Sequence, residues 1–174
     1  MVLSQGALAA DGTVNFTGEI VDTLCSIAPS SQNLTVPLGK VSRATFYDSN
    51  PIAVGAAASV GKKATPAKFA IDLIGCGATA TGAFVTFNGV AAAGNPDLLG
   101  LANAGQVGTA TATGVAIELG DSAGTRIKLG EKSQEYILGK GDNSLKFQAA
   151  YIATATAVTA GPANAVAQFT VAYK

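Results

Sequence analysis

Short segments that alternate between apolar and polar residues recur along the whole chain of 174 residues. Most are rich in Val, Ile, Phe, Thr or Tyr, and clusters of Gly, Pro, Asn and Asp separate them. A period of two residues places alternate side chains on opposite faces of a strand, so one face of each segment is suited to burial. We therefore expect strands at 13–21, 33–38, 68–76, 82–90, 114–120, 125–130, 145–155 and 165–174.

Helices contribute little to the predicted fold. No stretch combines a helical period with good caps, and glycines interrupt Ala-rich pieces such as "VGAAASVG". A short helical turn near 44–49 is the exception that we expect. Many short strands at this spacing are typical of an antiparallel sandwich or barrel, and no internal repeat or long linker divides the chain. The predicted fold class is all-β, in a single folded domain.

The composition excludes several classes of function. Eleven Lys and Arg residues balance eleven Asp and Glu residues, so the chain lacks the basic excess that nucleic-acid binding requires. It has no histidine, which is the commonest general base and metal ligand. Two cysteines alone do not make a thiolate metal site. We expect no enzymatic activity, no catalytic residues, no metal, no cofactor and no nucleic-acid partner.

Four charged residues within or beside apolar segments were weighed as candidates for chemistry. Alternation puts Asp72 and Glu118 on the outer faces of their strands, which favours solvated carboxylates over a catalytic pair. Lys62 and Lys63 are predicted to form a solvated loop tip. None of the four indicates an active site.

The two cysteines, Cys25 and Cys76, lie far apart in the sequence and outside any C-x-x-C motif. A structural disulfide is the favoured interpretation, and two free core thiols are the alternative. Closing a loop of this size would stabilise the fold by about 4 kcal/mol in the chain-entropy model. A disulfide would also indicate an oxidising compartment.

Apolar strand patterns lie close to both ends of the chain. Residues 1–9 contain Ala-Leu-Ala, similar to a signal-peptidase site, and we expect them to be the remnant of a leader. Residues 10–24 form a predicted arm, and 25–174 the folded domain. On the arm, one face carries Gly12, Val14, Phe16, Gly18 and Ile20. Alternation alone does not decide whether this face packs in its own sheet or completes the sheet of another molecule.

Four stretches together resemble one protein family. The first is "GTVNFTGEIVDTLC", with a glycine seven positions before the first cysteine. "FAIDLIGC" resembles the family's strand that brings the second cysteine to the first, and "GVAIELGDSAGTRIKLG" its mid-domain hairpin. The end, "LKFQAAYIATATAVTAGPANAVAQFTVAYK", is similar to the family's C-terminal region. The chain resembles structural subunits of chaperone–usher pili, close to the type 1-like major pilins.

The resemblance implies an immunoglobulin-like β-sandwich that lacks its last strand and is completed by a donated strand. It implies that Gly12, Val14, Phe16, Gly18 and Ile20 enter the groove of a neighbouring subunit. The C-terminal strand would line that groove with Ala167, Phe169, Val171 and Tyr173. The implied partners are copies of the chain in a head-to-tail filament, a periplasmic chaperone and an outer-membrane usher. The implied location is an extracellular fimbrium that supports cell adhesion, reached through the periplasm.

Three alternatives to a major shaft subunit stay open from the sequence. A minor adaptor of the same kind of pilus would carry the same arm and groove. An adhesive tip subunit would add a separate lectin domain and lack the arm. A self-contained secreted immunoglobulin-like binding module would be a monomer without need of a chaperone.

Overall fold

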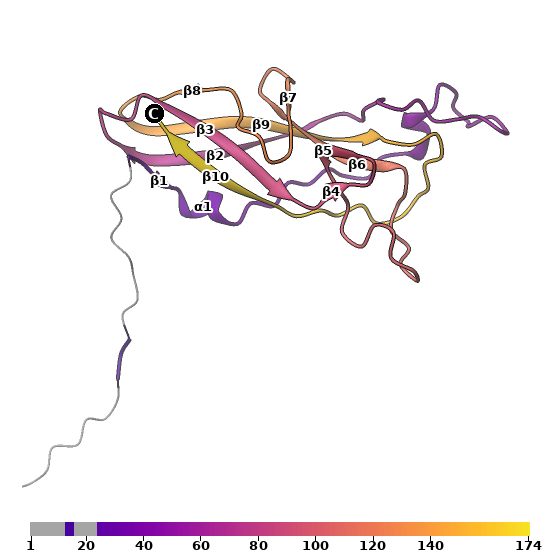
Figure 1. The fold of residues 1–174 in the computed structure, drawn as a ribbon, viewed down its shortest axis with the longest axis horizontal. Helices are drawn as coiled ribbons and strands as arrows, with labels where there is room; N and C mark the ends of the chain where they lie inside the picture. Colours follow the sequence, from indigo (N-terminus) through magenta and orange to yellow (C-terminus); the bar gives the residue numbers. More distant parts are fainter. Residues whose placement is uncertain (1–12, 16–23) are drawn as a thin grey trace, which may run out of the picture.

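The computed structural model describes residues 13–15 and 24–174, and all of the secondary structure lies in the second range (Figure 1). One short α-helix and one short 3-10 helix accompany the strands. In chain order the elements are β1 (Ser26–Ile27), α1 (Pro29–Gln32), η1 (Arg43–Phe46), β2 (Ala67–Cys76), β3 (Gly82–Gly89), β4 (Ala91–Ala92), β5 (Asn95–Leu99), β6 (Val115–Asp121), β7 (Arg126–Ile127), β8 (Tyr136–Ile137), β9 (Gly141–Ala153) and β10 (Ala167–Tyr173).

The strands form two antiparallel sheets, which confirms the predicted all-β class. The larger sheet has the order β1-β2-β9-β6-β5-β4, with β7 paired to β6. The smaller sheet has the order β10-β3-β8. In the larger sheet β9, of 13 residues, pairs with β2 on one side and β6 on the other. In the smaller sheet β10 pairs with β3 along its full length, from Ala167 opposite Gly89 to Tyr173 opposite Ala83.

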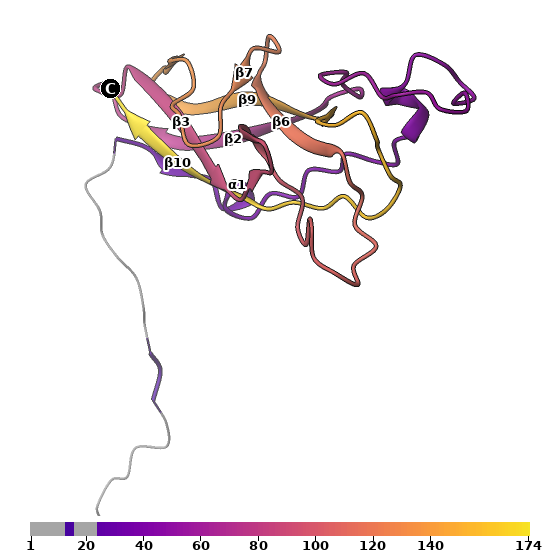
Figure 2. The ribbon, with the colours of Figure 1, turned by 45° about the vertical axis from the view of Figure 1, so that its right-hand side comes forward.

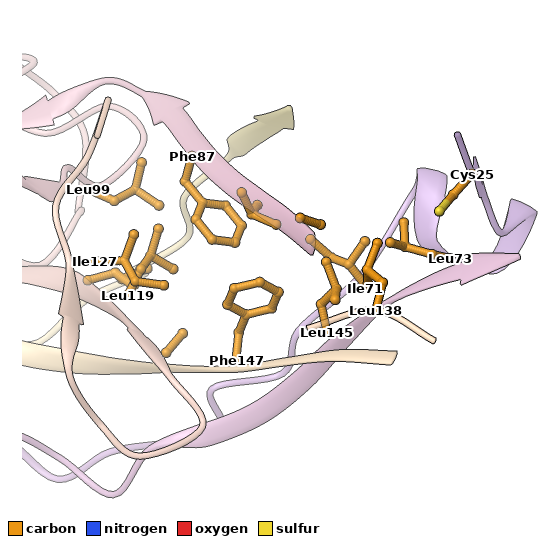
Figure 3. Close-up of a cluster of buried hydrophobic side chains, with 14 of the residues drawn as sticks. Cys25, Ile71, Leu73, Phe87, Leu99, Leu119, Ile127, Leu138, Leu145 and Phe147 are labelled. Atoms are coloured by element: carbon orange, nitrogen blue, oxygen red, sulfur yellow. The ribbon is translucent and has the colours of Figure 1, made fainter. Parts of the chain in front are cut away.

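The main core lies between the two sheets. Alternation in β2 buries Ile71 and Leu73, while their neighbours face outward. Figure 3 shows Phe87 of β3 and Phe147 of β9 pointing toward each other from the two sheets. Their ring centroids lie 5.2 Å apart in an edge-on arrangement, which aromatic pairs favour. Each core strand therefore contributes the apolar face that its sequence period predicts.

A disulfide joins Cys25 to Cys76, as predicted from the two cysteines. Both residues are buried beside the main core. The bond ties the chain just before β1 to the end of β2, and β1 adds a short pairing between Ser26 and Ile74. The first described residues of the domain are thus fixed to one end of the larger sheet.

Two sequence predictions about strands are wrong. Residues 33–38 form no strand, because Asn33 ends α1 in a turn and 34–38 have no regular secondary structure. Residues 91–99, for which the sequence predicts no strand, form the short β4–β5 hairpin, with Ala92 opposite Asn95. The predicted helical turn is present one residue early, as η1. Within the described residues, no helix has the length and apolar character needed to cross a membrane.

The prediction that Glu118 is solvated is also wrong, whereas the side chains of Lys62 and Lys63 are 38% and 45% exposed. Glu118 does lie on the outer face of β6, but it is only 5% exposed. Lys63 and Arg126 cover it, and both form ion pairs with its carboxylate. Lys62 pairs with Asp48 at 3.1 Å. Alternation identifies the face of a strand, but it does not reveal whether that face is covered by other side chains.

Candidate binding groove

Two extended segments of the chain have a backbone edge without a partner. Residues 34–41, which follow α1 and its C-cap Asn33, make no backbone hydrogen bond to another described residue. β10 pairs with β3 on one edge, and no described strand pairs with its other edge. Figure 2 shows both segments along the same lower edge of the molecule, the first in indigo and the second in yellow. Unpaired strand edges are exposed donors and acceptors that can bind another strand.

A hollow of about 610 Å³ separates these two segments. Its floor consists of core side chains from the larger sheet and β3, and its walls are the two extended segments. The lining residues are Leu34 to Gly39, Phe69, Ile71, Phe87, Leu99, Ile117, Leu119, Ala149, Tyr151, Ala163 to Ala167 and Phe169. Packed protein cores rarely leave a void larger than a water molecule. The hollow is therefore a place where the side chains of the main core are left uncovered.

A second hollow of about 320 Å³ continues the first. Both are lined by Gly39, Tyr151, Ala163 and Asn164. We call the two together the groove, and the two parts the large and the small hollow. The small hollow lies toward η1 and the 158–162 segment. Tyr151 stands between the parts, where its hydroxyl donates a hydrogen bond to the carbonyl of Ala163 at 2.7 Å.

The groove is open because the residues along its C-terminal wall are small. Burial alternates from Ala163 through Ala165 and Ala167 to Phe169, and the residues between them are exposed. The inward-facing positions pack against the main core but fill little space until Phe169. A bound strand with alternating apolar side chains would fill the hollow, and its backbone would hydrogen-bond to the unpaired edges of the two walls.

Few charged side chains line the groove. Among the residues of both linings, Lys40 and Arg43 are the only charged ones, and both line the small hollow. Burial raises the pKa of the Tyr151 hydroxyl, so this group stays a neutral donor. Among the described residues, no three His, Cys, Asp or Glu side chains gather where they could hold a metal ion. The geometry suits an apolar, hydrogen-bonding polypeptide.

The structure places the predicted C-terminal residues in two groups. Ala167 and Phe169 line the large hollow. Val171 and Tyr173 lie beyond it, partly buried against the main core. The hydroxyl of Tyr173 donates to the carbonyl of Cys25 at 3.4 Å. The end of β10 and the start of the domain are therefore neighbours.

Most of the predicted arm lies outside the described residues. This applies to Gly12, Phe16, Gly18 and Ile20, and to the predicted leader at 1–9. Val14 is described and is 76% exposed. The role of the arm therefore stays a prediction.

Sequence reasoning missed the opposite wall of the groove. Residues 33–38 have the pattern of a strand, yet this segment contains Pro37, which has no N–H to donate. Proline within a strand pattern indicates an edge or an unpaired strand. That signal was available in the sequence, whereas the position of Tyr151 between the hollows was not.

Comparisons with known proteins agree with this architecture. The family model of the fimbrial proteins matches residues 14–174. The chain is 38% identical to the fimbria A protein of Serratia marcescens, over 99% of this chain and 90% of the relative. It is 36% identical to the type-1 fimbrial protein C chain of Escherichia coli, over 94% of this chain and 83% of the relative.

Solved structures show the same fold. A type I fimbria protein of Burkholderia pseudomallei has a TM-score of 0.62 at 34% identity, covering 88% of this chain and 91% of that one. The P pilus rod subunit PapA has a TM-score of 0.66 at 24% identity, covering 87% of this chain and all of that one. The resemblance drawn from the four sequence stretches is confirmed. The chain belongs to the fimbrial protein family, and it is a structural subunit of a cell-surface fimbria and not an enzyme.

Proposed function

We propose that the chain is a rod-forming subunit of a chaperone–usher pilus. Copies join head to tail when the arm of one subunit, residues 10–24, inserts as a strand into the groove of the next. The observation that carries this proposal is the groove itself. It combines an unfilled apolar hollow of about 610 Å³ with two unpaired backbone edges.

An inserted strand would pair the free backbone edges and fill the apolar hollow at the same time. Its backbone would hydrogen-bond to the edges of β10 and of residues 34–41, which leaves fewer unpaired groups in an apolar site. Its apolar face would fill the hollow between them. Burial of Val14, Phe16 and Ile20 would contribute about 1.5–3 kcal/mol each, as an upper estimate. Gly12 and Gly18, on the same face, would let the backbone approach the floor of the groove closely.

The position of the arm's root supports assembly into a filament. The arm joins the domain at Cys25, beside Tyr173 at the far end of β10 from the small hollow. Each subunit thus carries a donor segment at one end and an acceptor groove along its side. Such a contact is heterologous and does not close on itself, so it generates an open filament.

The open groove supports a need for escort proteins before assembly. An exposed apolar groove with free strand edges favours aggregation. A periplasmic chaperone that lends a strand would cover the groove, and an outer-membrane usher would provide the site where the arm replaces it. The Cys25–Cys76 disulfide is consistent with passage through an oxidising compartment.

The experiment uses one donor-blocked and one acceptor-blocked variant of the full chain. Phe16→Asp places a charge on the inserting face of the arm, where burial without a partner is costly. Ala165→Trp places a ring in the wall of the large hollow. We expect neither variant to form fibres alone, whereas each keeps its disulfide and its β-sheet circular dichroism.

Mixing the two variants gives the decisive result. The intact arm of the Ala165→Trp chain should enter the intact groove of the Phe16→Asp chain, and growth should stop at a dimer. Size-exclusion chromatography and electron microscopy distinguish dimers from fibres. Fibres from either variant alone, or a mixture that stays monomeric while the wild type polymerises, would contradict the proposed mode of assembly.

A further inference from the structure

The two charges in the groove both lie at one end and have the same sign. Lys40 and Arg43 line the small hollow, and among the residues that the structure describes no acidic one lines either hollow. Both side chains are exposed, and neither forms an ion pair with a described residue. By contrast, the neighbouring Lys62 is already paired with Asp48. The mouth of the small hollow is therefore a basic site without an acidic partner.

The arm carries charges of the opposite sign only. Residues 10–24 contain Asp11, Glu19 and Asp22, and they contain no lysine or arginine. Glu19 and Asp22 lie close to the root of the arm, within six residues of Cys25. An acidic segment and a basic mouth attract each other when they lie within about one Debye length, roughly 8 Å at physiological salt.

We propose that Lys40 and Arg43 bind the carboxylate of Asp22 from the arm of a second copy, and that Glu19, three residues earlier on the arm, adds to the attraction. The pairing sets the direction and the register in which the arm enters the groove. This inference rests on the proposed function and adds a specificity device to it.

The pairing requires one direction of insertion. The groove wall runs from Leu34, at the large hollow, to Lys40, at the small hollow. With Asp22 near Lys40, the arm runs parallel to this wall and antiparallel to β10. Extended chains rise about 3.3 Å per residue, and the wall is interrupted only near its end, at Gly39 with a φ of 71°, so equal numbers of residues cover nearly equal lengths. Six residues separate Leu34 from Lys40, and six separate Phe16 from Asp22. Phe16 would then lie at the level of Leu34, in the large hollow.

The same geometry disfavours the chain's own arm as the occupant. That arm starts beside Tyr173, at the opposite end of β10. If it folded back along its own groove, its acidic root would lie at the Tyr173 end, and its direction would be parallel to β10. Glu19 and Asp22 would then lie far from Lys40 and Arg43. The basic mouth thus selects the arm of a sister molecule.

A charge-swap series tests the pairing in the full-length chain. The acceptor variant is Lys40→Glu with Arg43→Glu, and the donor variant is Glu19→Lys with Asp22→Lys. Exposed ion pairs contribute about 0.2–1 kcal/mol each, so turning two attractive pairs into repulsive ones should slow polymerisation about tenfold at low salt. Combining all four substitutions should restore the rate to within about threefold of the wild type. The control, Lys68→Glu with Lys140→Glu, changes the net charge equally at exposed sites outside the groove and should leave the rate unchanged.

Zero-length crosslinking tests the contact directly in wild-type fibres. A carbodiimide joins a lysine amine to a carboxylate only when the two touch. Fibres grown from a mixture of ¹⁵N-labelled and unlabelled chains should yield crosslinks between Lys40 and Glu19 or Asp22, including pairs of one labelled and one unlabelled peptide. Crosslinks of these carboxylates to Lys174 in pairs of one labelled and one unlabelled peptide would overturn the proposed direction.

The outcomes separate this inference from the proposed function. If the wild type polymerises and the charge-swap variants match the control, the basic mouth has no role and only this inference fails. If crosslinks at Lys40 join peptides of equal labelling alone, the arm belongs to the same chain, and both proposals fail.

Discussion

The buried carboxylate of Glu118 provides a quantitative test of the larger sheet. Glu118 lies opposite Ala150 in the β6–β9 pairing. Lys63, which pairs with Ile152 on the other side of β9, extends across the small Ala150 side chain to reach it. Arg126 approaches from β7, and its Nε donates to the carboxylate at 2.6 Å. The three charges thus connect β6 to β7 on one side and, across β9, to the segment at Lys63 on the other.

The expected magnitude follows from the unequal burial of the partners. Glu118 is 5% exposed, whereas the side chains of Lys63 and Arg126 are 45% and 38% exposed. In Glu118→Gln the two cations regain water, so the loss should lie between that of an exposed pair and that of a buried pair, about 1–3 kcal/mol. In Lys63→Met with Arg126→Met the carboxylate is left buried and unpaired, which should cost about 3–5 kcal/mol. Removal of Lys63 and Arg126 should therefore lower the free energy of unfolding more than removal of the Glu118 carboxylate.

Urea unfolding followed by circular dichroism measures both losses, at a concentration where the chain is monomeric by size exclusion. At roughly 2–4 °C per kcal/mol for a domain of this size, Glu118→Gln should lower Tm in thermal unfolding by about 2–12 °C. The control is Glu131→Gln, which removes an exposed carboxylate 3.9 Å from Lys128 and should change stability by less than about 0.5 kcal/mol. The reasoning would be refuted if Glu118→Gln lost no more stability than this control. It would also be refuted if Glu118→Gln lost more stability than Lys63→Met with Arg126→Met.

Three further predictions concern other parts of the fold. Burial, together with the charge of Asp121, raises the pKa of Tyr136 to about 12. The folded state therefore holds this proton more tightly than the unfolded chain, and stability should be intact below about pH 10 and decline toward pH 12; urea midpoints of Tyr136→Phe should decline less over this range than those of the wild type. Loss of the disulfide in Cys25→Ser with Cys76→Ser should lower the unfolding free energy by about 4 kcal/mol in the chain-entropy model, and an unchanged urea midpoint would show that the bond is dispensable. Gly114→Ala should destabilise far more than Gly55→Ala in thermal unfolding, because both positions have positive φ but only at Gly114 would the new Cβ clash with a backbone oxygen, that of Ala157; equal losses would mean that the backbone strain dominates.

The strands that build the core were predictable because their burial pattern is local. In β2, β3, β10 and the first half of β9, burial alternates along the strand as the period of two requires, whereas both faces of β6 are buried. The β6–β7 hairpin likewise follows from the turn residues "GDSAGT" between two apolar runs. These features depend on neighbours in the sequence, so the sequence alone contains enough information.

Features that depend on distant partners were not predictable in the same way. The segment 33–38 has a strand's pattern, but the structure offers it no partner strand, and Pro37 removes one donor. Glu118 lies on the predicted face, yet its burial depends on Lys63, two strands away in the sheet. The groove follows from several small residues along 163–167, and no single residue of that stretch signals a cavity.

The most direct test of the account is a cryo-electron microscopy map of fibres assembled from the wild-type chain. The account predicts a continuous strand between residues 34–40 and β10 of each subunit. Side-chain density should identify it as residues 12–20 of the adjacent subunit, running antiparallel to β10. A groove that stays empty in the fibre, or one filled by the arm of the same subunit, would contradict the claim that sister molecules complete the fold.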